Sequence, residues 1–139
     1  MNYLLDTCVI NELISTHPNP DVIGFVDSLE QEEIYLSVIT VGEITKGIHL
    51  LPNSERKRQL ETWLRDAFLA RFDGHILPLD TKVFMRWGEL SANLERLGLP
   101  PASAMDSLIA ATALTHQMVL VTMHEDDFRN TQLEIVNPW

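Results

Sequence analysis

Short apolar runs alternate with longer amphipathic segments along nearly the whole of this 139-residue chain. Five of these runs have the length and residue types of buried strands, and they span residues 3–5, 34–37, 76–79, 119–121 and 133–136. Parallel strands need crossover connections, and intervening helices supply them while covering both faces of the sheet. The alternation therefore predicts an α/β fold, a three-layer sandwich with a central, mostly parallel sheet flanked by helices.

The segments between the runs predict six helices, over residues 9–15, 21–29, 41–51, 54–71, 81–97 and 104–116. The fourth is expected to begin after Ser54, a good N-cap residue. Its buried side is expected to carry four residues at helical spacing, namely Leu60, Trp63, Leu64 and Ala67. Pro100 and Pro101 predict a rigid loop before the last helix.

The length and the 45% hydrophobic content predict one globular domain over residues 1–139, with no repeat or linker. No apolar run approaches the roughly 18 residues of a membrane helix. The single cysteine, Cys8, suits a reducing cytoplasm. A formal charge of -10 argues against non-specific nucleic-acid binding over the whole surface. The contiguous cations Arg56, Lys57 and Arg58 are interpreted as a solvated helix face, with phosphate steering as the alternative.

Four carboxylates, those of Asp6, Glu43, Asp106 and Asp127, lie close to strand ends or helix starts. An open α/β sheet gathers such positions into one crevice, however far apart they are in sequence. Carboxylates held close together repel one another unless a cation lies between them. These residues are therefore a candidate divalent-metal site, and that site is the candidate function.

Helix capping is the alternative explanation for each carboxylate. Asp6 has the position of an N-cap. The capping-box spacing occurs in residues 40–43, 103–106 and 122–125, where Thr or Ser precedes an acid by three positions. Capping and metal binding are compatible, because helix N-termini also offset packed negative charge.

Several segments resemble the PIN-domain ribonucleases. They are residues 4–12 (LLDTCVINE), 36–47 (LSVITVGEITKG), 106–113 (DSLIAATA), 120–122 (LVT), the Asp127-Phe128 pair and 136–139 (VNPW). The segments follow the order and spacing of that family over essentially the whole chain. Within the family, the chain is similar to the VapC-type toxins of bacterial type II toxin–antitoxin pairs.

The resemblance implies an endoribonuclease that depends on Mg²⁺ or Mn²⁺, with Asp6, Glu43 and Asp106 as acidic ligands. The fourth ligand position departs from the family pattern, because Met123 replaces the usual Arg and His124 the usual Asn or Asp. Asp127 is the best match there, and the alternatives are His124, Glu125 and Asp126. Thr7 and Thr122 are expected to support the site as hydrogen-bond donors, with ordinary helix capping as the alternative.

The resemblance also implies partners: an RNA substrate, a second copy of the chain, a cognate antitoxin and, through the antitoxin, operator DNA. A hydrophobic groove near Leu50-Leu51-Pro52 and the two middle helices is the expected contact surface. No membrane contact is expected, and the cytoplasm is the expected location. A catalytically silent PIN-fold module that forms a regulatory complex with an antitoxin on DNA is the alternative function. A phosphoaspartyl phosphatase is disfavoured, because Cys8 stands where that class needs a second Asp.

Overall fold

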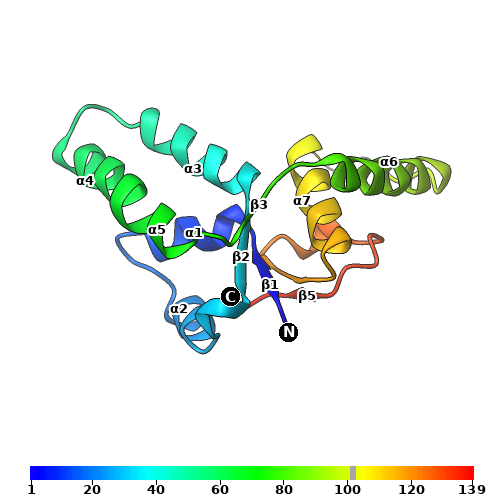
Figure 1. The fold of residues 1–139 in the computed structure, drawn as a ribbon, viewed down its shortest axis with the longest axis horizontal. Helices are drawn as coiled ribbons and strands as arrows, with labels where there is room; N and C mark the ends of the chain where they lie inside the picture. The colour runs from blue at the N-terminus through cyan, green and yellow to red at the C-terminus, as the bar shows by residue number, and fades with distance from the viewer. Residues whose placement is uncertain (101–102) are drawn as a thin grey trace.

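A five-stranded, entirely parallel sheet lies at the centre of the molecule, in the strand order β3-β2-β1-β4-β5 (Figure 1). The computed structural model describes residues 1–100 and 103–139. The strands are β1 (Tyr3–Leu5), β2 (Ile34–Ser37), β3 (Ile76–Leu77), β4 (Val119–Val121) and β5 (Ile135–Val136). The predicted α/β fold is confirmed, and all five predicted strands are present, with β3 and β5 shorter than expected. Pro101 of the predicted proline loop lies outside the described residues.

Helices lie on both sides of this sheet, with α1 to α5 on one side and α6 and α7 on the other (Figure 1). The first group comprises α1 (Thr7–Leu13), α2 (Pro20–Asp27), α3 (Val38–His49), α4 (Glu55–Trp63) and α5 (Leu69–Arg71). The second group comprises α6 (Thr81–Arg96) and α7 (Ala104–Thr115). Within residues 1–100 and 103–139, no helix has the length and apolar character needed to cross a membrane.

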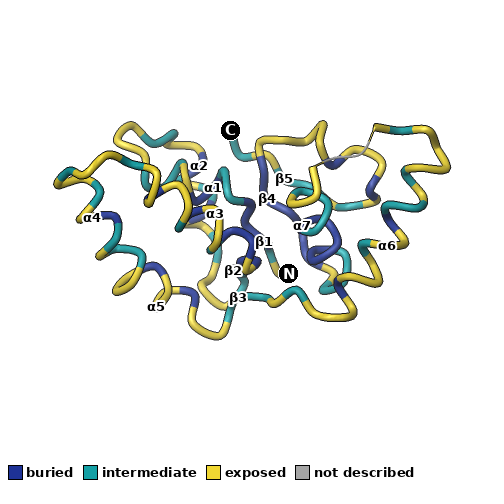
Figure 2. Tube along the Cα trace, turned by 90° about the horizontal axis from the view of Figure 1, so that it is seen from above, coloured by how far each residue is buried: buried dark blue, intermediate teal, exposed yellow. Residues whose placement is uncertain are grey.

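Two hydrophobic cores fill the spaces between the sheet and its helices, and the central strands contribute to both. Leu5 of β1 packs into the core under α1 to α5, and its neighbour Leu4 into the core under α6 and α7. In β4, Val121 packs into the core under α1 to α5, and Leu120 packs into the core under α6 and α7. Successive strand residues point to opposite faces, so these strands are apolar throughout and lie buried at the centre of Figure 2.

Helix α3 begins three residues earlier than predicted. Its N-cap is Ser37, whose hydroxyl accepts a hydrogen bond from the backbone N–H of Ile39 at 3.0 Å. The alternative that Thr40 and Glu43 form a capping box is therefore wrong. Both residues lie inside the helix, and their side chains are available for other contacts.

The helix predicted over 54–71 contains a π-helical turn at Leu64–Phe68, between α4 and α5. Ser54 caps α4 as expected, by accepting from the backbone N–H of Lys57. The expected burial of Ala67 is wrong, since Ala67 is exposed and Phe68 is buried at 2% exposure. A π turn hydrogen-bonds five residues apart instead of four, so it moves every later side chain around the helix axis.

The contiguous cations at the start of α4 make contacts within the chain. Lys57 donates from Nζ to the backbone carbonyls of His49 and Leu51, at 3.1 Å each, at the end of α3. Arg56 donates to a backbone carbonyl of α1's C-cap residue, and Arg58 forms an ion pair with Glu55. These contacts favour a structural role for the basic run over the phosphate-steering alternative.

Candidate active site

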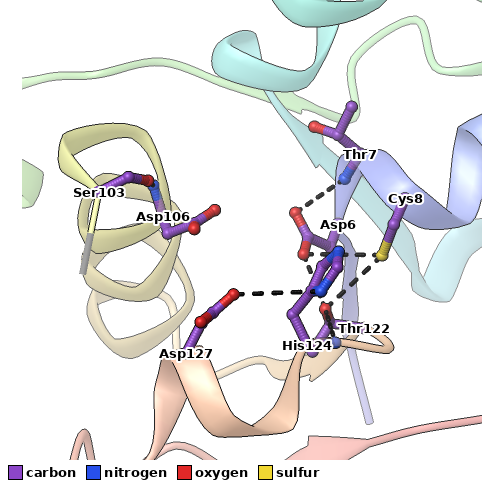
Figure 3. Close-up of polar contacts among 8 residues, drawn as sticks. All are labelled: Asp6, Thr7, Cys8, Ser103, Asp106, Thr122, His124 and Asp127. Atoms are coloured by element: carbon purple, nitrogen blue, oxygen red, sulfur yellow. Dashed lines mark hydrogen bonds and ion pairs between the residues drawn. The ribbon is translucent and has the colours of Figure 1, made fainter.

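Asp6 lies at the carboxyl end of the central strand, where it is also the N-cap of α1. One carboxylate oxygen, Oδ1, accepts from the backbone N–H of Thr7 at 2.8 Å. The other, Oδ2, accepts from the hydroxyl of Thr122 at 2.7 Å (Figure 3). The backbone N–H of Asp6 donates to the backbone carbonyl of Val121 in β4 at 3.0 Å. Asp6 therefore links β1 and α1 to the end of β4, and it is only 3% exposed.

The environment of Asp6 makes a negative charge costly there. Burial raises the pKa of this carboxyl above its ordinary value of 3.8, and the nearby charge of Asp106 raises it further. Hydrogen bonds from Thr122 and from the backbone of Thr7, together with the charge of His124, lower the pKa but leave the net shift upward. A bound cation would relieve both causes of the increase.

Glu43 approaches the site from α3 through a hydrogen bond to Thr7, the residue that follows Asp6. The hydroxyl of Thr7 donates to Oε1 of Glu43 at 2.7 Å. Thr7 also contacts the hydroxyl of Thr40, with 3.0 Å between the two oxygens. Thr40 is completely buried, whereas Glu43 is exposed. Sequence reasoning missed Thr40, because its spacing from Glu43 matched a capping box.

Asp106 enters the site from the first turn of α7. Its backbone N–H donates to the hydroxyl of Ser103, at 3.1 Å, so the expected cap at Ser103 is confirmed. The cap leaves the Asp106 carboxylate free of that role, and Figure 3 shows it pointing toward Asp6. This proximity explains why the charge of Asp106 raises the pKa of Asp6.

The fourth ligand position lies in the short 3₁₀ helix Glu125–Phe128 that follows β4. Asp127 places Oδ2 4.0 Å from Nδ1 of His124, and both side chains face the space beside Asp6 (Figure 3). Asp126 instead forms an ion pair with Arg129. The capping-box alternative at Thr122 is wrong, because His124 is the N-cap position of this helix and the Thr122 hydroxyl donates to Asp6.

The acidic residues therefore lie near one another without forming a closed ligand set. In the part of the chain that the structure describes, no three His, Cys, Asp or Glu side chains are close enough to hold an ion as they stand. The donors are carboxylate oxygens, the ligand type that Mg²⁺ and Mn²⁺ prefer. The residue types fit such an ion, and Asp6 carries a buried charge that such an ion would compensate.

Cys8 is packed against the same carboxylate. Its sulfur lies 3.8 Å from Oδ2 of Asp6 and 3.6 Å from the hydroxyl of Thr122 (Figure 3). Burial, and then the charge of Asp6, raise the pKa of the thiol to about 11. A neutral thiol of this kind agrees with a packing role and argues against a nucleophile.

An open apolar groove adjoins the site on the side of Glu43. It has a volume of about 650 Å³ and runs between α3 and α7. Exposed hydrophobic side chains line it, among them Val38, Leu50 and Met105. Leu50 belongs to the bend where a hydrophobic groove was expected, although the opposite wall comes from α7 rather than α4. Glu43 and Lys46 supply the charged part of the lining.

Comparison with known proteins decides the family. The PIN domain family matches residues 3–133. The chain belongs to the PIN-domain family. Toxin FitB of Neisseria gonorrhoeae is 38% identical over 136 residues, which cover 98% of this chain and 97% of that protein. The VapC ribonuclease Y4jK of Sinorhizobium fredii is 33% identical over 136 residues, 98% of this chain and 96% of its own length.

Solved structures of similar proteins share the fold over 99–100% of the chain. FitAcB of Neisseria gonorrhoeae has a TM-score of 0.94 at 36% identity, and the match covers 99% of this chain and 98% of that chain. VapBC2 of Rickettsia felis, solved bound to a DNA fragment from its promoter, has a TM-score of 0.78 at 29% identity, with 100% and 99% coverage. The expected likeness to the VapC-type toxins is thereby confirmed.

Proposed function

We propose that this PIN-domain protein is a metal-dependent endoribonuclease and the toxin of a bacterial toxin–antitoxin pair. The observation that carries the proposal is the buried carboxylate of Asp6, hydrogen-bonded on both oxygens and faced by the charge of Asp106. A structural cap needs only one of those hydrogen bonds and gains nothing from a second acid nearby. Two relatives are named as VapC ribonucleases, which supports RNA as the substrate.

The residues that would hold Mg²⁺ or Mn²⁺ are Asp6, Glu43, Asp106 and Asp127, with His124 beside them. When bound, such an ion lowers the pKa of a water molecule and offsets the charge that develops on a phosphodiester under attack. The chain's own part is to hold the ligand oxygens in place. Thr122 fixes Oδ2 of Asp6 and Thr7 fixes Oε1 of Glu43, so both carboxylates are oriented before an ion or substrate arrives.

A protein partner is part of the same proposal. FitAB was solved bound to a DNA fragment and VapBC2 bound to a DNA fragment from its promoter, which supports an antitoxin partner that brings operator DNA to this protein. We expect a homodimer as well, with the groove between α3 and α7 as a contact surface, because its exposed apolar side chains favour burial. A nuclease that acts on cellular RNA is expected in the cytoplasm.

The decisive experiment incubates the purified protein with total RNA in Mg²⁺ or Mn²⁺, and again in excess EDTA. Cleavage in the metal and its loss in EDTA are expected, and Asp6→Asn should remove the activity while the circular dichroism spectrum stays that of a folded protein. Equal RNA integrity in all samples would favour the alternative, a silent module that still binds its antitoxin.

A further inference from the structure

We infer that Thr40 is a positioning residue for the metal site, acting on Glu43 through the hydroxyl of Thr7. This inference rests on the proposed metal-dependent function. The observation is a chain of hydroxyls that starts in the core under α3 and ends on a carboxylate oxygen at the site, with oxygen–oxygen distances of 3.0 and 2.7 Å.

The direction of the chain follows from counting protons. A threonine hydroxyl has one proton to donate, and Thr7 gives its proton to Oε1 of Glu43. The contact between Thr7 and Thr40 therefore requires Thr40 to be the donor. Each donation polarises the next, so the Thr40 hydroxyl strengthens the hold of Thr7 on Glu43.

Thr40 differs in this respect from other helical threonines of the molecule. Thr45, Thr112 and Thr115 donate to the backbone carbonyl four residues earlier, at 2.7 Å each. Thr40 lies in the first turn of α3, and the residue four positions before it belongs to β2, outside the helix. Its hydroxyl therefore reaches sideways to α1 instead of back along its own helix.

The hydrogen bond from Thr7 restricts the side chain of Glu43. Glu43 is exposed, and its long side chain would otherwise populate many rotamers. The hydrogen bond fixes Oε1, while Oε2 accepts none of the hydrogen bonds found within residues 1–100 and 103–139. A carboxylate anchored by one oxygen presents the other to a ligand, and this is how outer-shell partners raise metal affinity.

Thr40→Val tests the inference, because valine keeps the buried shape and removes only the hydroxyl. The measurement is the Kd for Mn²⁺ of the metal-free protein, by isothermal titration calorimetry, beside the melting temperature in EDTA. We expect Thr40→Val to bind Mn²⁺ about tenfold more weakly and Thr40→Ser to stay within about twofold of wild type. Thr45→Val, on the same helix but bonded back to Val41, is the matched control and should leave the Kd unchanged.

A double-mutant cycle checks the route of the effect. In a Thr7→Val background, Thr40→Val should add little to the loss of affinity, because Thr7 is the link to Glu43. Additive losses would overturn the route through Thr7, and equal Kd values for Thr40→Val and Thr45→Val would overturn the role of Thr40. Failure of the wild type to bind Mn²⁺, or an unchanged Kd in Asp6→Asn, would overturn the proposed function and this inference together.

Discussion

At the scale of single residues, Asp6 combines a structural and a chemical role. Its carboxylate caps α1 and also accepts from Thr122, 116 positions further along the chain. Its burial raises its pKa, so the folded protein holds this charge at a cost in stability. The sequence placed Asp6 at a strand end, but the hydrogen bond from Thr122 depends on β1 and β4 being neighbours, which no local pattern reveals.

Asp6→Asn should raise the stability of the metal-free protein at neutral pH. The raised pKa means that Asp6 favours the folded state while protonated, below about pH 3.8, and that this contribution is lost as the pH rises through the folded-state pKa. The gain of the variant over wild type should therefore be largest near pH 7 and shrink as the pH falls toward 4. Thermal melts in EDTA across this range measure it.

Asp27→Asn is the control for that series, since Asp27 is exposed at the end of α2. Its melting temperature should track wild type at every pH. A variant at Asp6 that melts well below wild type at pH 7 would instead assign the carboxylate to capping alone.

The thiol of Cys8 should react slowly with alkylating agents. With a pKa of about 11 against an ordinary 9.0, its thiolate fraction at neutral pH is about a hundredfold smaller than that of an ordinary thiol. Mass spectrometry after timed iodoacetamide treatment of the native and the urea-unfolded protein checks this. Asp6→Asn should speed the native reaction only modestly, because burial is the larger cause. Equal native and unfolded rates would contradict the burial argument.

At the scale of elements, the strands were predictable and the helix boundaries were less so. Apolar runs identify β1, β2 and β4 because a parallel strand that is buried on both faces needs apolar residues at nearly every position. The start of α3 was misplaced because Ser37 and Thr40 are both capable caps, and only tertiary packing selects Ser37. The π turn at Leu64–Phe68 was invisible because its residues suit an α-helix equally well.

That π turn gives a direct test of which side chain the helix buries. Phe68→Ala should lower the free energy of unfolding by about 3–5 kcal/mol, because Phe68 fills the core beside Trp63 and Phe72. Leu69→Ala, at a neighbouring position that is 37% exposed, should cost clearly less. Urea unfolding measures both, and a loss for Phe68→Ala no larger than that for Leu69→Ala would contradict the burial of Phe68.

At the scale of the whole molecule, acidic residues from four distant segments lie around the carboxyl end of β1, although no three of the described side chains are close enough to hold an ion as they stand. The molecule carries a formal charge of -10, so concentrating further negative charge there is unfavourable without a counter-ion. The proximity of Asp106 to Asp6, which affects the pKa of Asp6, could be anticipated from the alternation of strands and helices. The full ligand set stays a prediction, and its fourth position was the hardest to anticipate because it depends on how the residues after β4 turn.

Mg²⁺ or Mn²⁺ should stabilise the folded molecule and should do so through this edge. A ligand that binds only the folded state stabilises it by RT ln(1 + c/Kd), where c is the free ligand concentration, so at one metal concentration a weaker site gives a smaller rise in melting temperature. Wild type should therefore gain more from millimolar Mn²⁺ than Asp6→Asn does, and Asp27→Asn should gain as much as wild type. Equal shifts for wild type and Asp6→Asn in differential scanning fluorimetry would count against a shared ion.

The central place of β1 in the sheet has a consequence for protein synthesis. Asp6 is synthesised more than a hundred residues before its partners, Val121 of β4 and Thr122. A nascent chain that has reached only α6 holds Asp6 and Glu43 but lacks Asp106 and the strand that encloses Asp6. Such a partial chain cannot assemble the proposed metal site, so the order of synthesis delays that site until the last third of the chain has been made and folded.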